Sequence, residues 1–315
     1  MAITDSEAVA GLRILVAIAQ ADGTIQDEER AALTAALEGI TLPAGTTVDS
    51  LLAEKVNVEK EMAAVKTPHA RVDIYESAYG MAYADGKCTK DEQKLLDQLK
   101  KSWEIPEKQA SFVARIFKET KDTVLPSNIQ PIADAEKRKK EITEDVLKYS
   151  LLSAVLGAFP IPGVAIATDL AIVAVQVKMV RDIGQYHGHK VDKESAKSLL
   201  YGLGLGTGAR IAVNNIVKLV PGWGSAFAAV TSFAATFAVG KVMDKYFADG
   251  KKADAGALKD DFKAAQKEGK AAYAENKGNI EALAGQRDKL EQLSNDLKDG
   301  KLSLEAYEKA VAELT

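Results

Sequence analysis

Hydrophobic and polar positions along most of the chain follow the spacing of helices. Apolar side chains recur every three or four residues, and the period-2 runs typical of strands are missing. The pattern therefore predicts an all-α protein in four parts. We expect a soluble helical bundle at 6–120, a linker with a basic helix at 121–147, a hydrophobic helical-hairpin domain at 148–247, and a C-terminal helical hairpin or coiled coil at 248–315.

Two apolar runs dominate the third part. Between Lys148 and Lys178 the only charged residue is Asp169, and between Lys218 and Lys241 there is none. Such runs usually cross a membrane, but proline interrupts both, because it lacks an amide donor and clashes with the preceding turn. We predict two helical hairpins whose arms are too short to span a hydrocarbon core of about 30 Å. Their Pro-Gly turns, the predicted membrane- or partner-binding residues, are Phe159, Pro160, Ile161, Pro162 and Gly163, and Pro221, Gly222 and Trp223.

Basic residues flank both apolar runs. Four of them, Lys137, Arg138, Lys139 and Lys140, stand in a row before the first run. Lys and Arg mark the cytoplasmic side and attract anionic lipid, so the pattern favours shallow or re-entrant hairpins entered from the cytoplasm. A basic patch together with inserted apolar surface supplies the two signals that stable anchoring needs. The alternative is a pair of hairpins buried in the core of a soluble helical bundle.

Composition limits the functions open to the chain. It has 315 residues, 47% of them hydrophobic and 6% aromatic, with a formal net charge of -4 that argues against a dedicated nucleic-acid binder. The single cysteine, Cys88, excludes a disulfide within the chain and a multi-cysteine metal site. Acidic residues precede the first apolar stretch, so we expect no signal peptide and a cytoplasmic protein. Because no Ser-His-Asp, Cys-His or HExxH arrangement is visible, we expect no enzyme.

An acidic loop occurs twice in the first part, at 21–29 and again at 84–92. In both copies an Asp-Gly pair supplies a turn before a new helix, and Thr89 with Glu92 has the spacing of a capping box. A turn with a helix cap is the favoured interpretation. The alternative is a divalent cation held by carboxylates, although the spacing is shorter than that of the twelve-residue calcium loop. The candidate ligands are Asp22, Glu29, Asp85 and Glu92. No other cofactor is expected.

This repeated Ala-Asp-Gly motif, with Tyr83 before its second copy and Trp103-Glu104-Ile105-Pro106 after it, resembles the TerB-like domain named for tellurite resistance proteins. The resemblance spans about residues 8 to 120. It implies a compact helical bundle, often appended to membrane-stress proteins, with a proposed metal-binding acidic face.

Two polar or glycine-rich motifs lie inside the hydrophobic domain. Glycines at 202, 204, 206 and 208 suggest a phosphate loop, but they follow no strand and lack the Gly-Lys ending. We therefore predict close helix packing at Gly202, Gly204, Gly206 and Gly208. His187 and His189 could bind a metal, but with no further ligand nearby a solvated loop is the favoured interpretation. Asp169 needs a polar partner wherever it is buried.

The order of motifs in the hydrophobic domain is similar to that of the YcjF-type domain of unknown function. Phe-Pro-Ile-Pro-Gly is followed by Asp169, Gln176, the segment 179–183, Tyr186 and the glycine-rich stretch. The resemblance implies a membrane-associated helical module without catalysis of its own. The segment 293–309 resembles the short C-terminal module called SHOCT, with its Asp-Gly turn, capping Ser303 and Tyr307, which implies oligomerisation.

Together these patterns predict a non-enzymatic bacterial scaffold that forms homo-oligomers at the cytoplasmic face of the membrane, with membrane lipid as its partner. A role in envelope or metal stress follows from the TerB-like resemblance alone. Two alternatives stay open. One is a soluble metal- or tellurite-stress-binding protein acting through the acidic loops, and the other is a soluble self-assembling particle or filament.

Overall fold

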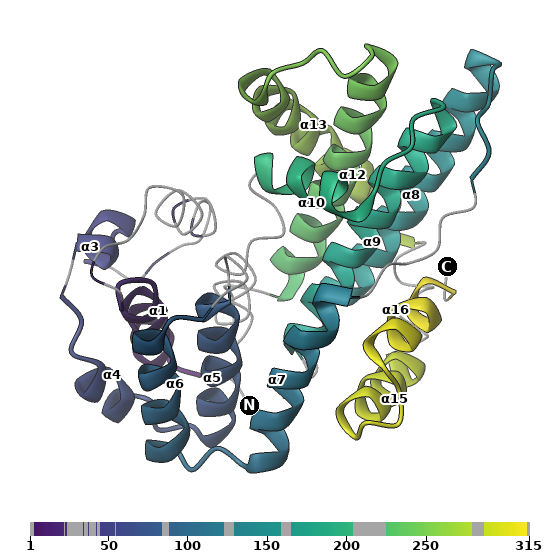
Figure 1. Cartoon of the computed structure of the whole chain (residues 1–315). Helices are drawn as coiled ribbons and strands as arrows, with labels where there is room; N and C mark the ends of the chain where they lie inside the picture. The colour runs from purple at the N-terminus through teal and green to yellow at the C-terminus, as the bar shows by residue number, and fades with distance from the viewer. Residues whose placement is uncertain are drawn as a thin grey trace. The chain divides into compact units, whose positions relative to one another are not determined.

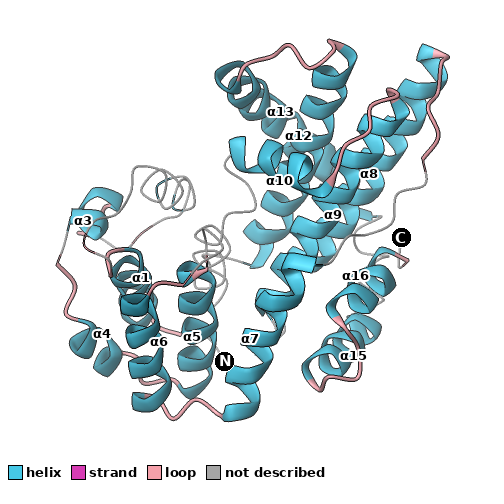
Figure 2. Ribbon diagram, viewed as in Figure 1, coloured by secondary structure: helices cyan, strands magenta, loops and turns pink. Residues whose placement is uncertain are grey.

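The structure is a computed structural model of the whole chain. It describes residues 3–21, 23, 34, 37, 42, 45–53, 55–83, 88–122, 129–158, 165–203, 225–278 and 287–313. Within these ranges every regular element is a helix and no strand occurs (Figure 2), so the prediction of an all-α fold is confirmed.

The chain divides into two compact units, the first built on Met1–Lys121 and the second on most of the rest. The first holds α1 (Asp5–Ala19), α3 (Val48–Ala53), α4 (Val58–Ala64), α5 (Pro68–Ala82), α6 (Lys90–Ser102) and α7 (Glu107–Asp122). The second holds α8 (Ala135–Ala158), α9 (Ala165–Tyr186), α10 (Lys193–Gly202), α12 (Ser225–Ala248), α13 (Ala255–Glu275), α15 (Arg287–Lys298) and α16 (Leu304–Ala312) (Figure 1).

Helix α1 lies at the centre of the first unit and is buried along nearly its whole length. It packs against α4 and α5, and its apolar side chains form the core together with those of α5 and α6. Trp103, at the end of α6, closes this core, because its indole Nε1 donates a hydrogen bond to the carbonyl of Met62 at 3.2 Å. Residues distant in sequence are thereby fixed around one apolar helix.

Helices α8, α9 and α12 form the centre of the second unit. A Cβ atom built at Gly157 of α8 would lie 3.0 Å from the Cβ of Ser232 on α12, and one built at Gly240 of α12 would lie 2.7 Å from Val146 Cγ1 on α8. The two contacts run in opposite order along the helices, so α8 and α12 are antiparallel. Glycine is needed at both positions because the helices approach too closely for a side chain.

Helix α9 runs parallel to α12. Gln176 of α9 donates a hydrogen bond to Thr236 Oγ1 of α12 at 3.0 Å, and His187, directly after α9, lies 2.7 Å from Asp244 of α12. The interruption predicted in the first apolar run is confirmed, since α8 ends at Ala158 and α9 begins at Ala165. Helix α8 also continues through residue 147 without a break, which places the basic residues and the first apolar arm on one helix of 24 residues.

The C-terminal helices α15 and α16 form the predicted helical hairpin. Gly300 turns the chain with a φ of 74°, and Ser303 caps α16 by accepting a hydrogen bond from the amide of Ala306 at 3.2 Å. Tyr307 is fully buried, and its hydroxyl lies 3.3 Å from Ser294 Oγ on the facing helix. The capping role predicted for Ser303 is therefore confirmed.

Candidate functional site

Most of the predicted acidic-loop ligands lie outside the described residues, namely Asp22, Glu29 and Asp85. Glu92 is described, and it serves as a helix cap. Its Oε2 accepts a hydrogen bond from the amide of Thr89 at 2.7 Å, while Thr89 Oγ1 accepts one from the amide of Glu92 at 3.2 Å. The predicted capping box is thus confirmed. No group of three or more His, Cys, Asp or Glu side chains suited to a metal ion occurs in the described part of the chain.

The sequence interpretation missed two buried carboxylates on α5. Asp73 is 3% exposed and Glu76 1% exposed, and Gln109 of α7 donates a hydrogen bond to Glu76 Oε1. With Ser77 they occupy one stripe of α5, a spacing that would usually mark a solvent-facing side. This stripe is buried instead, because α5 lies inside the unit with most of its surface covered.

Three tyrosines follow one another along α5 and its C-cap. The rings of Tyr79 and Tyr83 stack with centroids 4.9 Å apart, and Tyr75 lies one turn earlier with its centroid 6.3 Å from that of Tyr79. Burial raises the pKa of Tyr75 to about 12, with the carboxylates of Asp97 and Glu107 acting in the same direction. Burial and the Tyr83 hydroxyl likewise raise the pKa of Tyr79. The phenols of Tyr75 and Tyr79 therefore stay protonated at physiological pH and act as packing groups.

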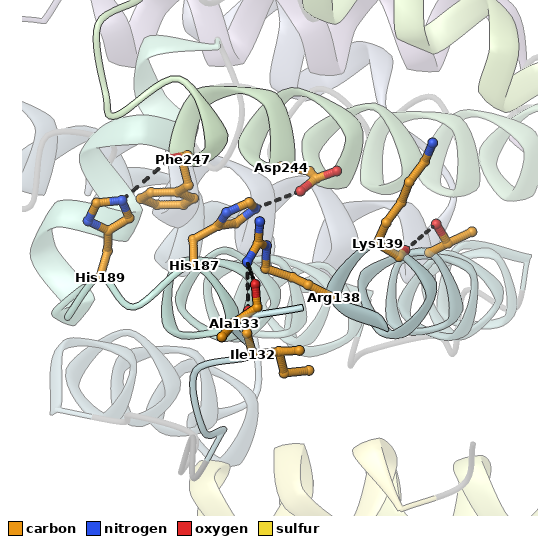
Figure 3. A network of polar contacts seen from close by, with 9 residues as sticks. Ile132, Ala133, Arg138, Lys139, His187, His189, Asp244 and Phe247 are labelled. Carbon is orange, nitrogen blue, oxygen red and sulfur yellow. Dashed lines mark hydrogen bonds and ion pairs between the residues drawn. The ribbon is translucent and has the colours of Figure 1, made fainter. Parts of the chain in front are cut away.

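The predicted lipid-binding basic residues separate into two classes. Lys137, Lys139 and Lys140 are exposed near the start of α8. Arg138 is half-buried, and its guanidinium donates hydrogen bonds to the carbonyls of Ile132 at 2.6 Å and Ala133 at 3.4 Å. Figure 3 shows this side chain turned toward the segment that precedes α8. Arg138 therefore fixes the entry to the helix, whereas the side chains of the three lysines are exposed to solvent.

The predicted polar turn between helices is present at residues 187–190, but its two histidines are held against α12. The His187 side chain is only 7% exposed, and its Nε2 lies 2.7 Å from Asp244 Oδ1 on α12. His189 Nε2 lies 3.4 Å from the carbonyl oxygen of Phe247, and the ring centroids of these two residues are 5.6 Å apart. Figure 3 shows both imidazoles directed at α12. They fasten the chain that leaves α9 onto that helix.

A second polar cluster joins α8 to α9. Tyr149 donates a hydrogen bond to Asp182 Oδ2 at 2.9 Å, and Lys178 forms an ion pair with the same oxygen at 2.5 Å. Tyr186 donates to Asp145 Oδ2 at 2.9 Å. The i,i+4 spacing of Lys178 and Asp182 is visible in the sequence. Their packing against Tyr149 is not visible there, and in the structure Asp182 is buried, with 1% of its surface exposed.

Electrostatics in this cluster follow from burial. The pKa of Asp145 is raised, chiefly because burial disfavours its charge and also because Asp182 is near, although the hydroxyl of Tyr186 opposes the shift. Burial and the Asp182 carboxylate raise the pKa of Tyr149. Both tyrosines therefore remain hydrogen-bond donors, and the cluster is suited to holding the two helices in one register.

The charges of the three central helices gather toward one end of the bundle. The charge-free stretches 149–158 of α8 and 225–240 of α12 lie side by side because the helices are antiparallel and in contact at Gly157 and Ser232. The charged stretches of α8, α9 and α12 meet at the other end, around Asp145, His187 and Asp244. Both predicted Pro-Gly turns lie outside the described residues, and each adjoins a charge-free helix end.

Of the four glycines predicted to pack helices closely, only Gly202 is described. It is exposed with no atom within 4 Å of a Cβ built there, so the prediction is wrong at this position, and Gly204, Gly206 and Gly208 lie outside the described residues. Among the described residues, close approaches occur at Gly157, Gly184, Gly240 and Gly269. In the described part of the chain, no helix is long and apolar enough to cross a membrane. Asp169 is buried at 6% exposure.

Comparison with known families concerns the first unit. Residues 2–119 match the model of the family "Protein of unknown function (DUF533)". This is a TerB-like family. The TerB-like resemblance of the N-terminal part is therefore supported at family level, over nearly the range expected from the sequence. No curated protein and no solved structure matches the chain. The YcjF-type and SHOCT-like resemblances receive no support from these comparisons and stay as predictions.

Proposed function

We propose that the protein is a non-enzymatic scaffold that docks on the cytoplasmic face of a membrane through the apolar end of the α8–α9–α12 bundle, where α8 and α12 carry no charged residue and Asp169 of α9 is buried. The observation that carries the proposal is the partition of charge along these helices. Stretches 149–158 and 225–240 lie together without a charged residue, and each adjoins a Pro-Gly turn. Exposed lysines at 137, 139 and 140 stand at the opposite end.

The length of the charge-free stretch of α8 fits partial insertion into the membrane better than a helix that crosses it. Ten residues of α8 rise about 15 Å, half of a hydrocarbon core of about 30 Å. Glycine contacts such as that of Gly157 with Ser232 are the packing devices that helices use where lipid surrounds them. Self-association at the membrane and a role in envelope or metal stress belong to the same proposal, and nucleic acid has no part in it.

Vesicle flotation with the full-length chain tests this function. The protein should float with vesicles of phosphatidylcholine and phosphatidylglycerol and float less with phosphatidylcholine alone. At an ionic strength of about 0.01 M, where the Debye length is ~30 Å, replacing Lys137, Lys139 and Lys140 by Gln should weaken binding, although these lysines stand roughly 14 to 18 Å along α8 from the charge-free stretch. The matched control replaces three exposed lysines of the first unit, Lys55, Lys60 and Lys90, and should bind as the wild type does.

Tryptophan emission reports which end enters the lipid. The chain has two tryptophans, and Trp103 is buried at 7% exposure in the first unit. A vesicle-dependent blue shift should therefore come from Trp223 and disappear in Trp223→Phe. The proposal is wrong if the protein stays with the unbound fraction at every lipid composition, or if the shift persists in Trp223→Phe.

A soluble self-assembling particle is the second candidate. In the described part of the chain the only exposed large hydrophobic side chain is Tyr201, at 46%, so the bundle covers most of its own apolar surface. Light scattering without lipid or detergent separates the two candidates. A stable assembly of many chains that does not bind vesicles would favour the soluble particle.

A further inference from the structure

Helix α13 lies antiparallel along α12 and covers one of its faces. A Cβ atom built at Gly269 would be 2.8 Å from Ala234 Cα, and the ring of Tyr273 meets that of Phe233 edge-on at 5.6 Å. Toward the charged end of the bundle, Lys241 pairs with Glu268 at 3.3 Å. Lys245 pairs with Asp261 at 2.7 Å.

This arrangement conflicts with full insertion of α12. Lys263, Lys267 and Lys270 are exposed on α13, which reaches along α12 as far as Phe233. Charged side chains inside hydrocarbon are expensive, so α13 would have to remain outside it. With α13 in place, only residues 225–232 of α12 can enter, about 12 Å at ~1.5 Å per residue. Without it, α12 is free to enter through about residue 238, roughly 21 Å, up to the level at which Lys148 of the antiparallel α8 lies beside it.

We propose that α13 is a displaceable cover on α12, and that an anionic lipid surface releases it by competing for Lys241 and Lys245. The inference rests on the proposed membrane function and adds its regulation. The structure is then the covered state of the bundle. Only the uncovered fraction of the protein inserts fully. The apparent affinity for the membrane is therefore the affinity of the uncovered form multiplied by that fraction.

The contacts that hold α13 in place suit a releasable cover. Its buried positions form a single narrow seam, Leu258, Phe262, Ala265 and Gly269. The ion pairs are exposed, with side-chain exposures of 54% for Lys241 and 59% for Glu268. Exposed pairs of this kind contribute little to stability and weaken further when a competing anion is present. Lipid phosphates supply such anions at high local density.

A steric wedge tests the cover directly. Leucine at Gly269 cannot fit against the backbone of Ala234, so Gly269→Leu should loosen α13. The vesicle partition coefficient of the full-length protein should rise about tenfold, the factor that ~1.4 kcal/mol of lost packing produces. Quenching of Trp223 by lipids labelled near the bilayer centre should also increase. The matched control is Gly278→Leu, which adds the same side chain where no atom lies within 4 Å of the new Cβ and should change neither quantity.

A reversible cross-link tests the same inference without overpacking. Cys88 is the only cysteine, so Cys88→Ser provides a clean background for Lys241→Cys with Glu268→Cys. Joining these positions with a cleavable bismaleimide keeps α13 on α12, so the uncovered form of the protein cannot be populated. Vesicle binding should then fall at least about fivefold. Cleaving the linker should restore binding in the same sample.

The two proposals fail in different ways. If neither the wild type nor Gly269→Leu binds vesicles, the membrane function is wrong and the cover falls with it. If the wild type binds but the cross-linked and cleaved proteins bind equally well, the membrane function stands and the cover is wrong. A Gly269→Leu protein that has lost its helical circular dichroism leaves the decision to the cross-link.

Discussion

The Glu7 carboxylate of α1 accepts a hydrogen bond from the backbone amide of Thr67 at 2.8 Å, directly before α5 begins. The same oxygen accepts from the amide of Lys66 at 2.9 Å, and the other oxygen accepts from the amide of Thr4 at 3.0 Å. One buried side chain therefore caps its own helix and fixes the start of another that lies 60 residues further along the chain.

Glu7 should make the first unit sensitive to acid. Burial by itself raises the pKa of Glu7, but hydrogen bonds from Thr4, Thr67 and Lys66 outweigh it and lower the pKa from 4.5 to about 2. Because the folded-state pKa is the lower one, this stabilisation is complete above pH 4.5 and is lost as the pH falls toward 2. Glu7→Gln should lower the free energy of unfolding at pH 7 by ~3 kcal/mol, measured by urea unfolding.

The control for Glu7 is Glu59→Gln, which changes an exposed carboxylate in the same unit. Its effect should stay within about 0.5 kcal/mol at every pH. Equal losses in the two variants would show that the hydrogen bonds of Glu7 do not hold α1 to α5.

Arg138 and Lys139 should differ although they are neighbours of like charge. Arg138→Gln removes charged donors from the carbonyls of Ile132 and Ala133 and should lower the free energy of unfolding by ~1 kcal/mol, since the site is half-exposed. Lys139→Gln should leave stability unchanged and weaken only vesicle binding. Thermal unfolding and flotation of both variants measure the difference, and matching profiles would refute the separation of roles.

The contact between Gly240 and Val146 should show compensation. Gly240→Ala places a methyl group 2.7 Å from Val146 Cγ1 and should lower the free energy of unfolding by ~1–3 kcal/mol through overpacking. Val146→Ala removes the side chain that would be struck, so the double variant should be more stable than the sum of the single effects predicts. Additive losses in urea unfolding would mean that α8 and α12 are not in contact at this point.

Asp145 should be a site where losing a charge increases stability. Burial, and then the neighbouring Asp182, raise its pKa above the usual 3.8, so the folded protein binds this proton more tightly than the unfolded chain does. Its contribution to stability therefore increases as the pH falls through the folded-state pKa. Asp145→Asn keeps an acceptor for Tyr186 and should raise the melting temperature at pH 7, with a difference that disappears below pH 3.8.

The matched control for Asp145 is Glu144→Gln, one residue earlier on α8 and 63% exposed in its side chain. No gain in melting temperature is expected there. A lower melting temperature for Asp145→Asn at pH 7 would contradict burial as the dominant influence on Asp145.

Local signals in the sequence were sufficient for the helices and their ends. The pair Thr89 and Glu92, and the single residue Ser303, cap the helices where the pattern placed them, because capping depends on residues three positions apart. The first apolar run likewise forms two helices, α8 and α9, as expected. These features need no knowledge of distant parts of the chain.

Predictions of solvent exposure from charge and polarity alone were wrong where burial decides the role of a side chain. Arg138, His187 and His189 are polar residues in segments that appear solvated, yet each is held by a partner that the fold supplies. Asp73 and Glu76 occupy a stripe of α5 that should face water and is covered instead. The reason is that helical periodicity identifies the face a residue lies on but not which faces other helices will cover.

By itself, the sequence determined that the chain is all-helical, that charge is rare in its two central apolar runs, and that the first of those runs forms more than one helix. Tertiary structure alone decided that α8 and α12 meet through Gly157 and Gly240, that Glu7 joins α1 to α5, and that α13 covers α12. Periodicity and capping are set within a few residues by backbone geometry. Close approach, burial and the pKa of a carboxylate depend on atoms that folding brings from far along the chain.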